Sequence, residues 1–204
     1  ASGTVDVGRD SDNAAYATGY ISNVRVIKGV AVYTGAFTPP SRAPLGTTCA
    51  NSTASYSSTT NVNTSSATAA TMLLLATNAG IPDSAMLYDL ETAGNAQIST
   101  TQSKFGGSSI YFDGTGDYLY ARSGVGDVLQ LGYGPQKFTV EAWIYPSSIG
   151  VNGTIAERGG GGSGWNATTG IQWTFFQHSS NRVYLQWWTG STYASAYTDT
   201  TLVA

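Results

Sequence analysis

Strict alternation between apolar and polar residues at 137–145, KFTVEAWIY, is the feature that most restricts the fold of this chain. A period of two is typical of a β-strand with one buried face. Comparable short runs recur between turn residues, and no segment has the period of a helix of three turns. The sequence therefore predicts an all-β fold, an antiparallel β-sandwich. The main strand-like runs are 4–8, 19–34, 72–76, 108–122, 153–158, 170–178 and 182–190.

Two runs give explicit expectations about side-chain direction. In 137–145, alternation places Phe138, Val140, Ala142 and Ile144 on one face. Thr139, Glu141, Trp143 and Tyr145 then lie on the other. In 19–27, GYISNVRVI, the same counting places Tyr20, Val24 and Val26 together.

Composition narrows the classes of partner. Charged residues make up only 10% of the 204 residues, whereas 13 Tyr, 6 Phe and 5 Trp supply material for a core. This aromatic content argues against disorder. A formal net charge of −3 with scattered Lys and Arg argues against nucleic acid and against an anionic membrane surface. The longest apolar run, MLLLA at 72–76, is too short to insert into a membrane.

The segment 46–70, GTTCANSTASYSSTTNVNTSSATAA, is composed almost entirely of small polar residues. It buries too little apolar area to offset the entropy of ordering, which predicts a flexible spacer. The alternative is a stiff extended ribbon of edge strands, as in a fibre. Cys49, the only cysteine, lies in this segment, so no intrachain disulfide is possible. The alternative for Cys49 is a disulfide between two chains.

Aromatic residues near the C-terminus are candidates for carbohydrate binding, because exposed rings stack on the C–H faces of sugars. Trp187 and Trp188 are adjacent in one strand, so they must point to opposite faces, one of them into the core. The same aromatic residues could instead fill the core or a subunit interface. The candidates are Trp173, Tyr184, Trp187, Trp188 and Tyr193.

The sequence contains no complete motif of the glycosidase or serine-nucleophile type. A glycosidase needs two neighbouring carboxyl groups, whereas Glu141 and Glu157 each stand without a partner in their strands. His178 is the only histidine and no nucleophile motif surrounds any serine, so we expect a hairpin-turn residue there. The sequence therefore predicts a protein that is not an enzyme.

Two longer motifs resemble parts of a known family. The segment 107–146 contains GSSIYFDGTGDYL and FTVEAWIYP, and it is similar to the opening of laminin-G-like domains. The segment 19–45 contains GYISNVRVIKG and YTGAFTPP, and it is similar to their closing part. These are jelly-roll sandwiches of the concanavalin A-like lectin/glucanase superfamily. Here the closing motif precedes the opening one. The resemblance therefore implies that 1–45 ends one sandwich, 46–70 is a linker, and 71–204 begins a second sandwich. Either the chain is an excerpt of a longer tandem protein, or its N-terminal strands complete the sheet of a neighbouring subunit.

This resemblance implies a non-enzymatic structural or adhesion module of a phage tail fibre, virion filament or bacterial cell surface. Its expected partners are other copies of itself or adjacent structural subunits. The alternative is a lectin domain that recognises cell-surface glycans. No cofactor is expected, although relatives bind Ca²⁺ through loop carboxylates, which leaves Asp113, Asp117 and Asp127 as candidate ligands.

Overall fold

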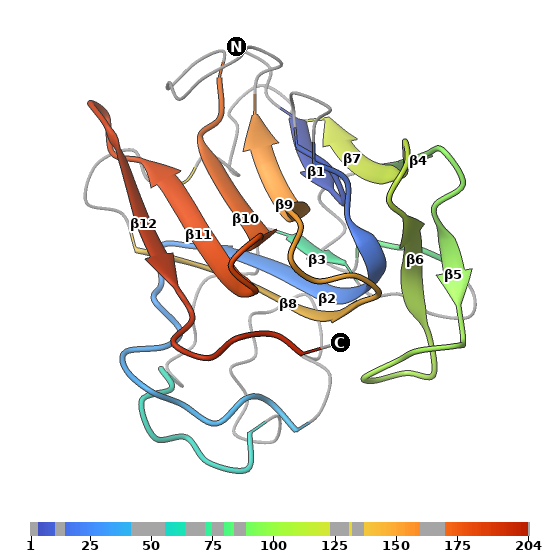
Figure 1. Cartoon of the computed structure of the whole chain (residues 1–204). Coiled ribbons are helices and arrows are strands. Elements are labelled where there is room, and N and C mark those ends of the chain that lie inside the picture. The colour runs from blue at the N-terminus through green and yellow to red at the C-terminus, as the bar shows by residue number, and fades with distance from the viewer. Residues whose placement is uncertain are drawn as a thin grey trace.

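The described residues form strands, turns and loops and contain no helix, which confirms the predicted all-β class. Two antiparallel sheets pack face to face as a β-sandwich (Figure 1). The computed structural model describes residues 4–10, 15–41, 56–63, 72–74, 80–83, 89–122, 131, 137–159 and 170–203.

The larger sheet has seven strands, and every neighbouring pair is antiparallel. In spatial order they are β12 (Tyr193–Tyr197), β11 (Arg182–Trp188), β10 (Trp173–His178), β9 (Gly153–Gly159), β1 (Thr4–Val7), β7 (Tyr118–Arg122) and β4 (Leu90–Ala93). The predicted hairpin of 170–178 with 182–190 corresponds to β10 and β11.

The smaller sheet has five strands and is built around β2 (Thr18–Lys28), the longest strand. One edge of β2 pairs first with β6 (Ser109–Asp113) and then with β3 (Met72–Leu74). The other edge pairs along its length with β8 (Phe138–Pro146). The short β5 (Gln97–Ser99) pairs with β6 and ends the sheet on that side.

The two N-terminal strands lie inside the sheets formed by the rest of the chain. β1 is hydrogen-bonded between β7 and β9, and β2 lies between β6 and β8. The segments assigned by sequence to two neighbouring sandwiches are thus paired within one chain. Burial explains this arrangement, since Val5, Val7, Val24 and Val26 are at most 1% exposed. They contribute apolar area to the core between the two sheets.

The core lies between the sheets and includes Trp173, Phe112, Ile110 and Leu119. A second, smaller cluster covers the outer face of β2 and joins Ile27 and Val32 to Tyr56 and Val62. An isolated bridge pairs Tyr33 with Val62. Residues 56–63 of the expected spacer are therefore packed against the sheet, because Tyr56 and Val62 supply apolar area that composition alone understated. The rest of 46–70, including Cys49, lies outside the described residues.

Candidate binding sites

Strand β8 forms an open edge of the smaller sheet. In the part of the chain that the structure describes, β8 pairs only with β2. Gly29 N donates to Lys137 O, and Ser147 N donates to Thr18 O, so the odd-numbered residues direct their peptide groups towards β2. The peptide groups of Val140, Ala142 and Ile144 therefore face away from β2. They are positioned to pair with a further strand.

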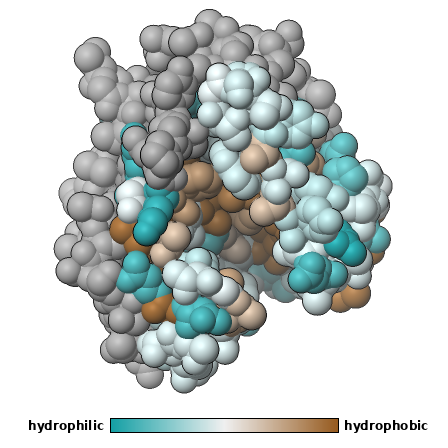
Figure 2. Space-filling view, turned by 90° about the vertical axis from the view of Figure 1, so that its left-hand side faces the viewer, coloured by the Kyte–Doolittle hydropathy of each residue, from teal (hydrophilic) through white to brown (hydrophobic). Residues whose placement is uncertain are grey.

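An apolar groove runs along this open edge. Two cavities of about 330 and about 510 Å³ share Val140, Ala142, Phe175 and Phe37 in their linings. One wall is the segment Phe37–Pro40, and the other is the inner face of β11 and β12, with Val183, Leu185 and Ala196. Figure 2 shows apolar residues recessed in a hollow between more polar parts of the surface. Within the described ranges, no strand of the smaller sheet lies opposite β11 and β12 beyond β8.

A polar cluster stabilises the wall of the groove on the β8 side. Arg25 forms an ion pair with Glu141, and the hydroxyl of Tyr33 donates to the same carboxylate. Burial lowers the pKa of Arg25, but the adjacent Glu141 outweighs this effect, and the net shift is upwards. Burial, followed by the Glu141 charge, raises the pKa of Tyr33. Glu141, considered above as a catalytic carboxylate, is thus held by structural partners. The ring of Tyr33 also stacks on Phe37 at 3.6 Å between centroids.

The aromatic residues predicted to bind carbohydrate divide between two faces of the larger sheet. Trp173 is fully buried, and Trp187 packs against the core with its ring 5.8 Å from that of Phe138. Trp173 therefore presents no free ring face, and Trp187 is half-buried. Trp188 lies opposite Tyr193 in the β11–β12 ladder, and alternation directs both outwards with Tyr184. The expected opposite orientation of Trp187 and Trp188 is what the ladder shows.

The outer face carries a row of rings that sequence reasoning found only in part. Tyr184 stacks on Tyr197 with centroids 5.0 Å apart, and Tyr197 is 54% exposed. Phe176 and His178 continue the row, with their centroids 5.6 and 4.7 Å from that of Tyr184. Arg182 lies 5.3 Å from the ring centre of Tyr197. Strand alternation and cross-strand register place Phe176, His178 and Tyr197 on the same face as Tyr184. These three residues could therefore have been predicted from the sequence once the β10–β11 hairpin was assigned.

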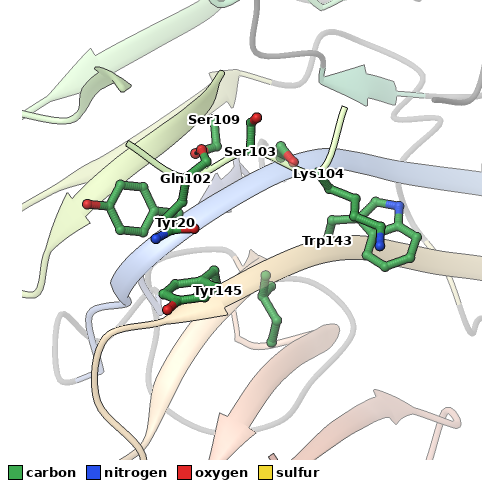
Figure 3. A pocket seen from close by; sticks show the side chains of 9 residues that line it. Tyr20, Gln102, Ser103, Lys104, Ser109, Trp143 and Tyr145 are labelled. Carbon is green, nitrogen blue, oxygen red and sulfur yellow. Dashed lines mark hydrogen bonds between the residues drawn. The ribbon is translucent and has the colours of Figure 1, made fainter. Parts of the chain in front are cut away.

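A third site lies on the outer face of the smaller sheet, where the segment between β5 and β6 covers β2 and β8 (Figure 3). Tyr20 and Tyr145 are direct neighbours in the β2–β8 ladder, as are Ser22 and Trp143. The pocket has a volume of about 120 Å³. Its rim carries Lys104, whose Nζ lies 4.7 Å from the centre of the Trp143 ring. The sequence analysis did not single out this pocket, because its rim comes from a loop with no motif.

Two of the three candidate calcium ligands have structural partners. Asp117 is fully buried, and its two carboxylate oxygens accept hydrogen bonds from the backbone N–H groups of Asn95 and Asp113. Asp113 accepts a hydrogen bond from Thr115 N in the turn between β6 and β7. Asp127 lies outside the described residues. Within the described ranges no three His, Cys, Asp or Glu residues are grouped as a metal site.

Comparisons with known proteins give no relative: no family model, no curated protein and no solved structure matches this chain. Across the described strands and loops, there is no helix with the length and apolar character to cross a membrane.

Proposed function

We propose that this protein is a non-enzymatic structural and adhesion module that assembles with further copies of itself by strand addition at β8. The observation that carries the proposal is the edge of β8, which no further described strand pairs with, beside an apolar face of β11 and β12 that no described strand covers. Unpaired sheet edges are templates for pairing with another chain. A virion fibre or cell-surface filament is a setting that uses such contacts.

The geometry favours a donated strand over the pairing of two β8 edges. Strands β11 and β12 extend past β8 in the larger sheet, so a second complete β8 edge would bring its own overhanging strands into the same space. A single extended segment avoids this conflict. Its backbone would pair with Val140, Ala142 and Ile144, while alternate side chains would enter the hollow near Leu185 and Ala196. Such a contact between different surfaces builds an open filament when the rotation between copies does not close, and a ring when it does.

Replacing Ala142 with proline tests the proposal. The N–H of Ala142 faces the open edge, where proline is tolerated because no ladder bond to β2 is lost. The Ala142→Pro chain should fold but lose the donor that an added strand needs. Sedimentation velocity from about 1 µM to about 1 mM should show concentration-dependent oligomers of the wild-type chain but not of this variant. Ala142→Ser keeps the N–H and should still assemble. A wild-type chain that stays monomeric over this range contradicts self-assembly.

Carbohydrate binding is a second candidate function, favoured by the exposed row of Tyr184 and Tyr197. A pair of stacked rings on a flat sheet offers area to sugar rings at low entropic cost. The test is a glycan array with the wild-type chain and with Tyr197→Ser, which removes the most exposed ring of the row. Binding that is equal for both chains, or absent for both, argues against this site.

A further inference from the structure

We propose that the pocket of Figure 3 binds an acidic sugar residue, a pyranose ring that carries a carboxylate. This site lies on the outer face of the smaller sheet, away from the row of Tyr184 and Tyr197 on the larger sheet. It does not rest on the assembly proposal, because none of the pocket's polar groups takes part in pairing at the edge of β8.

Aromatic rings form the base of the pocket. Tyr20 of β2 lies beside Tyr145 of β8, with ring centroids 6.1 Å apart and nearly perpendicular planes. Tyr145 is 52% exposed, so a large part of its side chain is accessible to a ligand. Trp143 closes the other end, where its ring packs edge-on against Phe105 at 5.5 Å. Exposed tyrosine faces at one end of a half-open cavity suit the C–H face of a sugar ring.

The charge of the pocket selects among sugars. Lys104 is exposed, and its ammonium lies over the Trp143 ring with no carboxylate partner in the described part of the chain. None of the nine lining residues is Asp or Glu. An anionic group on the ligand would therefore meet a cation without meeting a competing carboxylate.

The remaining polar groups match hydroxyls. Gln102 is half-buried, and Figure 3 shows its side chain directed towards the space between Tyr20 and Tyr145. Ser103 adds an exposed hydroxyl on the rim. The Ser109 hydroxyl already donates a hydrogen bond within the protein, from its Oγ to Gln102 O at 2.6 Å. This bond fixes the loop over the pocket. A ring with several hydroxyls and one carboxylate satisfies these groups, whereas a purely apolar anion leaves the Gln102 amide and Ser103 without partners.

The test uses the 204-residue chain and three small probes. These are glucuronate, glucose, which lacks only the carboxylate, and cyclohexanecarboxylate, which lacks the hydroxyls. Amide shifts in two-dimensional NMR report where each probe binds. We expect glucuronate to shift residues 102–104 and the Trp143 indole, with a dissociation constant on the order of millimolar for one sugar unit. Glucose should bind the same residues more weakly.

Matched variants separate the pocket from other surfaces. Lys104→Gln should weaken glucuronate about tenfold and leave glucose unchanged, because a charge-assisted contact is lost. Lys137→Gln removes an exposed lysine outside the pocket and should have no effect. Tyr145→Ala should weaken both sugars, whereas Val151→Ala, which truncates an exposed apolar side chain outside the pocket, should weaken neither. The proposal is overturned by shifts confined to β10–β12, by equal binding of cyclohexanecarboxylate, or by no shifts at about 100 mM glucuronate.

Discussion

Arg25 and Glu141 form an ion pair directly beside a bulge in β2, with side chains only 2% and 18% exposed. The β2–β8 register shifts between Ser22 and Arg25, and Asn23 adopts a positive φ of 52° at this point. The extra residue changes the direction of every following side chain. Val24 and Val26 therefore enter the core, and Arg25 turns outwards to meet Glu141.

Glu141→Gln should destabilise the protein, because it leaves the buried guanidinium of Arg25 without its counter-charge. Removing one partner of a buried ion pair typically costs about 3–5 kcal/mol, and the partial exposure of Glu141 places the expected loss near 3 kcal/mol. Urea unfolding measures the change in free energy. The exposed Glu91 provides the control, since Glu91→Gln should change stability by less than about 1 kcal/mol. Equal effects of the two substitutions would show that the ion pair contributes nothing specific.

The bulge itself depends on the left-handed backbone of Asn23. Asparagine tolerates this conformation and glycine adopts it freely, whereas a β-branched residue is strained there. Asn23→Gly should therefore change the free energy of unfolding by less than about 1 kcal/mol, and Asn23→Val should lower it by about 1–3 kcal/mol. Thermal unfolding of both variants checks the difference. A valine variant as stable as the glycine variant would mean that the bulge does not need a positive φ.

Sequence patterns predicted the positions of the strands better than they predicted which side chains of each strand point into the core. The uninterrupted alternation of 137–145 predicted β8 and its inward residues correctly, because nothing interrupts the period of two. The same counting in β2 grouped Tyr20 with Val24 and Val26, whereas the bulge separates them. A bulge at Asn23 leaves little trace in a single sequence, since asparagine is also common in ordinary turns. The pocket around Lys104 was missed for a related reason: its parts meet only through tertiary packing.

Asp6 should give the stability of the protein a specific dependence on pH. Burial raises the pKa of its carboxyl, and the ion pair with Arg9 at 2.9 Å only partly opposes this shift. The folded state therefore holds the proton more tightly than the unfolded chain. The contribution of Asp6 to stability is full below the unfolded pKa of about 3.9 and is lost as the pH rises through the higher folded value.

The check is urea unfolding of the wild type and of Asp6→Asn at several values between about pH 3 and about pH 7. The free energy of the wild type minus that of the variant should fall as the pH rises, because asparagine does not titrate. A difference that grows with pH would mean that the attraction of Arg9 outweighs burial.

A designed disulfide decides whether β1 completes its own sandwich or that of a neighbour. Val7 and Ala156 face each other between β1 and β9. They form a non-hydrogen-bonded pair, since Gly8 N donates to Ile155 O in the adjacent position. Such pairs have Cα atoms about 4.5 Å apart, within the range that a disulfide spans. Val7→Cys with Ala156→Cys, in a Cys49→Ser background, should therefore oxidise within one chain.

Electrophoresis without reductant and intact mass identify the product at about 1 µM chain, where intermolecular contacts are rare. Two neighbouring sandwiches that exchange their N-terminal strands would give covalent dimers or longer chains instead. Val7→Cys with Ala196→Cys provides the control, because β12 is separated from β1 by three strands and no crosslink should form. A single-chain disulfide in the first variant alone establishes that residues 4–28 and the C-terminal strands build one core, and it leaves the edge of β8 as the surface that a second copy must use.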